Sequence, residues 1–229
     1  MSVYVCVALL LTAVASAELN STRPGSMFGP DVSHYQGTVD WGRVKAAGAS
    51  FAFAKASEGL HTQDDQFAHN WAGIKAAGIK VRGAYHFGHP EEDAVAQAKH
   101  FISQVGATTS GDLLVLDIET TGGQAPSAVA KWCDDFLASL MSGTDLPSNR
   151  VLVYTGAWFW NSKVGDSKAS SHPLWVSGYT SAPPMPNDWS RWTYWQYTDK
   201  ASDCGPAGAV DCSVFHGSLE DLHALAGVV

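Results

Sequence analysis

The sequence predicts an α/β protein whose strands close into a barrel, and three observations lead to this class. Short β-branched or aromatic runs alternate with segments of helical periodicity along the chain. Lys-Ala-Ala-Gly occurs at 45–48 and 75–78, each time ending a helical pattern directly before a strand. Eight strands are expected, beginning near residues 29, 51, 79, 113, 151, 173, 192 and 209. Eight strands with intervening helices are typical of a closed barrel.

The first half of the chain has the clearest elements. Strands are expected at 51–56 and 79–86, directly after the two glycines. In the helix that follows, one face carries Ala94, Ala98, Phe101, Ile102 and Val105. A fully apolar strand comes next at 113–118, Pro126 opens a second amphipathic helix, and another strand follows at 151–154. Continuous apolar strands between amphipathic helices indicate a parallel sheet covered by helices.

The spacing of the strands changes in the second half. Successive predicted starts are about 22 to 38 residues apart up to 151, and then about 22, 19 and 17 residues apart. The last intervals are short for a strand, a crossover helix and two loops, so we expect helices to be missing there. An open doubly wound sheet is the alternative, but no glycine-rich phosphate loop follows the first strand.

Composition and charge exclude several classes of protein. With 45% hydrophobic and 11% aromatic residues, the chain can bury a core, which excludes a disordered, collagen or coiled-coil protein. It has 14 basic and 22 acidic residues and a net charge of −8. Nucleic-acid binding needs clustered Lys and Arg, so we expect no nucleic-acid partner.

The chain is divided into a signal peptide at 1–17, a short tail at 18–27 and one domain at 28–229. Residues 1–17 carry no charged side chain and end in Ala-Ser-Ala, which is typical of a secretory signal peptide. A retained membrane anchor is the alternative, although the run is shorter than the ~20 residues of a spanning helix. Asn20 starts an N-glycosylation sequon. We therefore expect a secreted, extracellular monomer without a membrane partner.

Three cysteines follow the predicted signal peptide. We pair Cys204 with Cys212, because the short loop between them contains glycine and proline and can bend back. Cys133 lies on an apolar helix face and is expected to be a buried thiol. The chain has no paired CxxC, so we expect no cysteine metal site.

The strand at 113–118 leads into the most informative residues, Asp117 and Glu119. Side chains alternate along a strand, so both acids share a face, and they point into the barrel mouth if Leu114 and Leu116 face the helices. Two carboxylates less than roughly 7 Å apart do not both ionise freely at neutral pH, and the protonated one suits a general acid. The alternatives are capping or ion pairing by these acids, or a Mg²⁺ site.

Further acids and many aromatic residues are expected at the same mouth. Asp31 lies at the end of the first predicted strand and Asp211 near the end of the last, and these strands are neighbours in a barrel. Nine Trp and seven Tyr cluster at strand ends, which favours a saccharide groove over a phosphate site. Lys55 and Glu58 are either a pair within the site or a structural salt bridge, and we favour the structural one. His34, His86 and His89 are interpreted as core or rim residues.

Six ordered motifs between about residues 28 and 216 resemble glycoside hydrolase family 25, the Chalaropsis-type lysozymes or N,O-diacetylmuramidases. They are DVSHYQG (31–37) with VDW (39–41), FAKASEG (53–59), GAYHF (83–87), LDIE (116–119), WQY (195–197) and VDCSVF (210–215). The resemblance implies a modified TIM-like (β/α)5(β)3 barrel in a single domain. It also implies hydrolysis of the β-1,4 bond between N-acetylmuramic acid and N-acetylglucosamine in bacterial peptidoglycan, with retention and without a metal or other cofactor.

The resemblance also implies roles for individual residues. Glu119 is similar to the family's general acid, and Asp117 to the residue that attacks the anomeric carbon or supports attack by the substrate's 2-acetamido group. Asp31 and Asp211 match the other family acids, expected to hold substrate and tune the pair. Sugar contacts are implied for Tyr85, Tyr154, Trp175 and Gln196. Cys212-Ser213 stands where many relatives have Leu-Asn, which puts the local hydrogen bonding there in question.

Two other functions compete with the muramidase. A catalytically silent wall-glycan-binding protein is the first, and intact Asp31, Asp117, Glu119 and Asp211 argue against it. A chitin-directed glycosidase is the second, but the strand has Leu114 and Leu116 where the longer acidic run of family 18 chitinases needs acids. For the muramidase we expect an acidic activity optimum.

Overall fold

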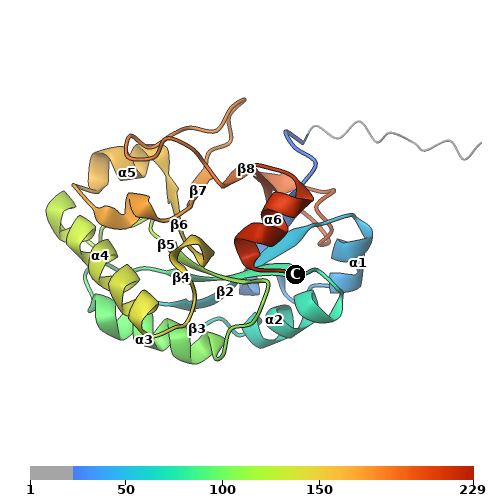
Figure 1. Ribbon diagram of the computed structural model, residues 1–229, viewed down its shortest axis with the longest axis horizontal. Helices are drawn as coiled ribbons and strands as arrows, with labels where there is room; N and C mark the ends of the chain where they lie inside the picture. The colour runs from blue at the N-terminus through green and yellow to red at the C-terminus, as the bar shows by residue number, and fades with distance from the viewer. Residues whose placement is uncertain (1–22) are drawn as a thin grey trace, which may run out of the picture.

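The computed structural model describes residues 23–229, so the predicted signal peptide and Asn20 lie outside the described residues (Figure 1). Strand β1 (Phe28–Val32) pairs with β2 (Phe51–Glu58) on one side and with β9 (Val210–Phe215) on the other. These pairings close an eight-stranded barrel in the order β1-β9-β8-β7-β6-β5-β4-β2. The α/β barrel predicted from the sequence is confirmed.

The other barrel strands are β4 (Val81–Phe87), β5 (Asp112–Asp117), β6 (Val151–Gly156), β7 (Leu174–Ser177) and β8 (Tyr194–Ala201). Every barrel strand begins within two residues of its predicted start. The two-residue strand β3 (Thr62–Gln63), which was not predicted, forms an antiparallel hairpin with β2 and is not part of the closed ring.

The direction of β9 differs from the expected parallel sheet. It runs antiparallel to both neighbours, β1 and β8, whereas the other barrel pairs are parallel. The prediction that Asp211 lies near the end of the last strand is therefore wrong, because Asp211 is the second residue of β9. The reversal still brings it to the carboxyl end of the parallel strands, where it pairs in register with Asp31. An apolar run of residues carries no signal for strand direction.

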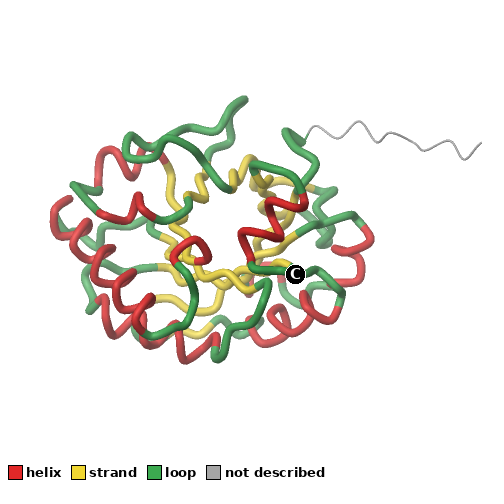
Figure 2. The backbone as a smooth tube through the Cα atoms, viewed as in Figure 1, coloured by secondary structure: helices red, strands yellow, loops and turns green. Residues whose placement is uncertain are grey.

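Helices cover only part of the barrel wall. They are α1 (Trp41–Ala46), α2 (Phe67–Ala76), α3 (Ala94–Val105), α4 (Pro126–Ser142), α5 (Ala157–Lys163) and α6 (Leu219–Ala226). No α-helix separates β7 from β8 or β8 from β9. Figure 2 shows loops along this side and helices around the rest of the ring. The predicted loss of helices from the second half is confirmed. Among the residues described, no helix is both long and apolar enough to cross a bilayer.

The apolar residues form two layers, and β5 shows how they arise. Leu113 and Val115 point into the barrel, while Leu114 and Leu116 pack outward beneath the helices. Outside them, α4 buries an apolar face that includes Val129, Trp132, Cys133, Phe136, Leu137 and Leu140. Since side chains alternate along the strand, Asp117 continues the inward row of Leu113 and Val115.

Candidate active site

A small cavity of about 80 Å³ opens at the carboxyl end of the parallel strands. We call it the acid cavity. Its lining consists of Asp31, Tyr85, Asp117, Glu119, Tyr154, Trp175, Gln196 and Asp211. These are the eight residues singled out as catalytic or sugar-binding from the sequence. The structure thus brings all eight together, and their individual roles remain proposals.

The four acids reach the cavity from three strands. Asp117 ends β5 and Glu119 follows two residues later, while Asp31 and Asp211 face each other across the β1–β9 pair. No three His, Cys, Asp or Glu side chains in residues 23–229 are arranged to hold a metal ion.

Asp117 and Glu119 influence each other's protonation. Burial raises the pKa of Asp117 well above its usual range, and the charge of Glu119 raises it further. Burial is also the main cause that raises the pKa of Glu119, followed by the charge of Asp211. Hydrogen bonding with Asp117 acts in the opposite direction and lowers the pKa of Glu119. The pair therefore retains a proton at a pH where isolated carboxyl groups are ionised.

Asp31 is held by a chain of hydrogen bonds that starts at two tyrosines. Gln196 Nε2 donates to Asp31 Oδ1 at 2.9 Å, and Tyr154 Oη donates to Gln196 Oε1 at 2.8 Å. Tyr179 Oη donates to the same Gln196 oxygen at 3.3 Å. Burial and the charge of Asp211 raise the pKa of Asp31. Tyr179 was not predicted as a site residue, although its position two residues after β7 is a usable signal.

Trp175 forms the floor of the acid cavity. Its ring stacks on Phe53 at 4.2 Å and meets Tyr154 edge-on at 4.5 Å between centroids. Trp175 is only 2% exposed, so little of its face is open to a ligand. Its Nε1 donates to Ser213 Oγ at 2.9 Å. Ser213, at the position where the sequence departs from many relatives, thus orients the floor of the site.

Lys55 is a positive charge that acts on both Asp117 and Glu119. Its Nζ lies 2.5 Å from Glu58 Oε2, and Glu58 Oε1 lies 3.0 Å from His89 Nε2. The charge of Lys55 also lowers the pKa of both Asp117 and Glu119. The favoured structural ion pair exists, and the same lysine also acts on the site.

The remaining candidates lie around the site or in the core. His86 is fully buried between Ser57 Oγ at 2.9 Å and Gln97 Oε1 at 3.0 Å, and burial lowers its pKa to about 4. His34 is at the rim, where it contacts Asp64. Cys133 is a buried free thiol. The structure contains a disulfide that joins the other two described cysteines, Cys204 and Cys212.

Comparisons with known proteins agree with this geometry. The family model for glycosyl hydrolases family 25 matches residues 30–205. Lysozyme M1 of Streptomyces globisporus is 38% identical over 86% of this chain and 70% of its own length. The N,O-diacetylmuramidase of Chalaropsis sp is 31% identical over 86% of this chain and 98% of its own length.

Solved structures give the same assignment. The bacterial lysozyme from Streptomyces coelicolor superposes with a TM-score of 0.82 at 36% identity, covering 90% of this chain and all of that structure. A family GH25 lysozyme from Aspergillus fumigatus reaches a TM-score of 0.78 at 32% identity, covering 87% of this chain and 98% of that structure. With its fold, its cluster of acids and its sequence all in agreement, the chain belongs to family 25 of the glycoside hydrolases.

Proposed function

We propose that this enzyme is a secreted lysozyme that hydrolyses the β-1,4 bond between N-acetylmuramic acid and N-acetylglucosamine in bacterial peptidoglycan, with retention. The observation that carries the proposal is the pair Asp117–Glu119, both with raised pKa values, inside a cavity built by acids and aromatic residues. The lysozymes and muramidase named above support the substrate. Secretion is inferred from the predicted signal peptide, and the enzyme is proposed to act as a monomer.

Glu119 is the proposed general acid, and the substrate can direct the shared proton to it. Asp117 Oδ1 and Asp31 Oδ2 are buried and have no hydrogen-bond partner among the described residues. A substrate N–H that donates to Asp117 stabilises its ionised form, because a hydrogen bond to a carboxylate favours the charged state. The proton then resides on Glu119, from which it passes to the leaving oxygen as the glycosidic bond breaks.

The placement of both carboxyl groups at the end of one strand favours substrate assistance over direct attack by Asp117. In two-carboxylate retaining enzymes the two groups flank the scissile bond. Here Asp117 ends β5 and Glu119 follows two residues later, so both reach the cavity from the same strand end. In the proposed reaction the 2-acetamido oxygen attacks the anomeric carbon while Asp117 accepts the amide N–H. Water then opens the cyclic intermediate and gives its proton to Glu119.

The test compares wild type with Glu119→Gln on purified peptidoglycan, because glutamine keeps the shape but cannot donate the proton. Turbidity should clear ~10²–10⁴-fold more slowly with the variant. Exposed Glu220→Gln is the matched control and should clear like wild type. Mass spectrometry after borohydride reduction identifies the new reducing end.

Each product pattern decides between the candidate functions. Reduced muramic acid from wild type supports the muramidase. Reduced glucosamine ends would assign glucosaminidase chemistry instead. Wall binding without cleavage by wild type would contradict the enzyme proposal and favour a silent glycan-binding protein.

A further inference from the structure

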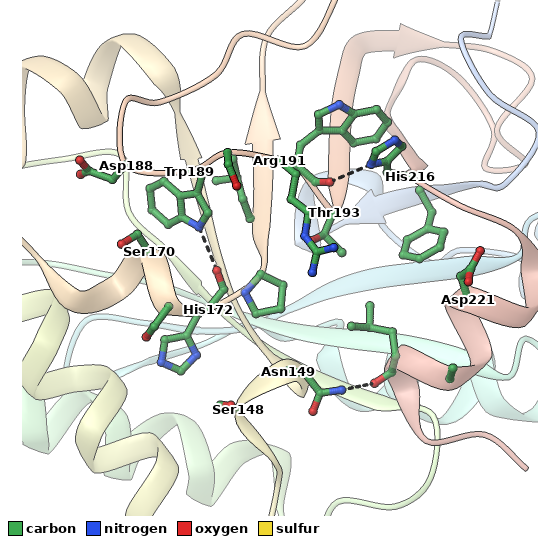
Figure 3. Close-up of a pocket in the computed structure, with 18 residues that line it drawn as sticks. Ser148, Asn149, Ser170, His172, Asp188, Trp189, Arg191, Thr193, His216 and Asp221 are labelled. Carbon is green, nitrogen blue, oxygen red and sulfur yellow. Dashed lines mark hydrogen bonds between the residues drawn. The ribbon is translucent and has the colours of Figure 1, made fainter.

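A second and much larger cavity lies at the opposite end of the barrel. It has a volume of about 660 Å³, within the range of small-molecule sites (Figure 3). Its walls come from the segments that precede β6, β7 and β8, the end of β9 and one side of α6. These segments meet at the amino-terminal end of the parallel strands, away from the acid cavity. We call it the second cavity.

Arg191 gives the second cavity a free positive charge. It is exposed and makes no hydrogen bond or ion pair within the part of the chain that the structure describes. Its side chain extends into the middle of the cavity in Figure 3. An unpaired guanidinium with five donors matches the geometry of a carboxylate. In a chain with a net charge of −8, this guanidinium specifically attracts an anionic group.

Two acids border the second cavity, but their carboxylates are engaged elsewhere. Asp188 Oδ2 accepts from Trp160 Nε1 at 2.6 Å. Asp221 Oδ2 accepts from Ser218 Oγ at 2.7 Å as part of the cap of α6. Both lie at the margins in Figure 3, on opposite sides of the cavity from each other. Arg191 is therefore the charged group best placed to meet a ligand.

The rest of the lining suits a polyhydroxylated ligand. The hydroxyls of Ser170, Ser190 and Thr193 make no hydrogen bond within residues 23–229 and so are available to a ligand. Trp192 stacks on the exposed His216 at 4.5 Å between centroids, which adds a flat aromatic edge to the wall. Hydroxyl groups beside an aromatic surface and one guanidinium match a sugar that carries an acid.

We propose that the second cavity binds a saccharide bearing a carboxylate, through Arg191 and the surrounding hydroxyls. The choice of muramic acid as that sugar, at wall positions where its lactyl carboxyl is free and not joined to a stem peptide, rests on the proposed function. The second cavity and the acid cavity are at opposite ends of the barrel. The sugar bound in the second cavity therefore belongs to a different glycan strand from the one being cut, or to a distant part of the same glycan strand. Binding there holds the enzyme on an insoluble wall without taking part in the chemistry.

The test uses Glu119→Gln protein, so that no turnover occurs, and N-acetylmuramic acid as the probe. The ¹⁵N indole signal of Trp192, assigned with Trp192→Phe, reports locally on the second cavity. The signal should shift on titration, and Arg191→Ala should weaken the apparent affinity about tenfold, as expected for the loss of one charge-assisted hydrogen bond. Arg191→Lys should restore part of the loss. Exposed Arg43→Ala, on α1, is the matched control and should bind like the parent.

N-acetylglucosamine lacks the lactyl carboxylate and separates the contribution of charge from that of the ring. N-acetylglucosamine should bind the parent protein more weakly than N-acetylmuramic acid does. Its affinity for Arg191→Ala should equal its affinity for the parent protein. An unshifted Trp192 signal, or an affinity that Arg191→Ala leaves unchanged, would overturn the inference. These outcomes are independent of the proposed function. A protein that binds at Trp192 but does not cleave peptidoglycan loses only the muramidase proposal, and one that cleaves without this binding loses only the second site.

Discussion

The two ends of the barrel differ in what surrounds their charged groups, of which Asp31 and Asp117 in the acid cavity are buried and those of the second cavity are exposed. The acid cavity, of about 80 Å³, contains four carboxyl groups, three of them with pKa values raised by burial and by another acid of the cluster. The second cavity, about 660 Å³, has its carboxylates satisfied by Trp160 and Ser218. Volume is therefore a poor guide to chemistry in this molecule. Reactivity is expected where carboxyl groups lie close together without enough hydrogen-bond partners.

Asp117→Asn should produce the largest difference between the two ends. We expect hydrolysis to fall ~10²–10⁴-fold, because the amide cannot take up the charge that assists the 2-acetamido group. The variant should also melt at a higher temperature near pH 7. The folded-state pKa of Asp117 is raised, so its ionisation in the folded protein costs stability at neutral pH, and asparagine removes that cost.

Turbidity clearing and thermal unfolding measure the two effects of Asp117→Asn. Exposed Asp145→Asn is the control and should change neither. Full activity of Asp117→Asn would remove the basis for treating the acid cavity as the reactive end.

The Cys204–Cys212 disulfide should stabilise the side of the barrel that lacks helices. It links the loop before β9 to the strand that carries Asp211. Replacing both cysteines with serine should lower the free energy of unfolding by about 2–3 kcal/mol, by the loop-entropy estimate for a bridge of this span. Urea unfolding with and without reductant measures it. Wild type should lose stability in reductant and the double variant should not, and equal sensitivity of both would contradict the assignment.

Gln196→Leu tests the hydrogen-bond chain that leads to Asp31. It removes the donor at 2.9 Å and leaves Tyr154 and Tyr179 without their acceptor. We expect kcat/KM to fall by about 5- to 150-fold, because buried polar groups lose their partners. Binding of N-acetylmuramic acid at Trp192 should not change. If kcat/KM and the binding of N-acetylmuramic acid at Trp192 both fell, the variant would be shown to perturb the whole barrel and not one cavity.

Lys55→Met should give the smallest effect, a shift in the pH profile. Hydrolysis needs the proton on the Asp117–Glu119 pair, so activity is present at acidic pH and is lost as pH rises through the raised pKa of the pair. Lys55 lowers the pKa of both acids. Its removal should therefore move the alkaline limb to higher pH. Rate profiles of wild type, Lys55→Met and the exposed control Lys131→Met check this, and a limb that moves to lower pH would contradict it.

Much of the acid cavity could be predicted because its residues lie at the ends of strongly patterned strands. Leu113 to Leu116 alternate between the two apolar layers, and this alternation directs Asp117 inward. The family resemblance then implied sugar contacts by Tyr85, Tyr154, Trp175 and Gln196, and all four line the acid cavity. The role of Tyr179 was missed because it depends on a hydrogen bond to Gln196, 17 residues away in the chain.

The second cavity had no signal in the sequence. Arg191 is an ordinary surface residue until β7, β8, β9 and α6 are assembled around it. The same is true of the dual role of Lys55, which acts on Asp117 at the end of β5 and on Glu119 just after it. Both features depend on contacts between segments that are distant in the chain.

The sequence by itself determined the α/β class, the order of the elements, the loss of the late helices and the acids at the strand ends, since periodicity and glycine placement are local properties of the chain. Only the tertiary structure decided the direction of β9, the burial of Asp117 and the partners that give some acids hydrogen bonds and leave oxygens of Asp31 and Asp117 without one. Strand pairing and burial arise between distant segments. For that reason the raised pKa values and the shape of each cavity belong to the folded barrel alone.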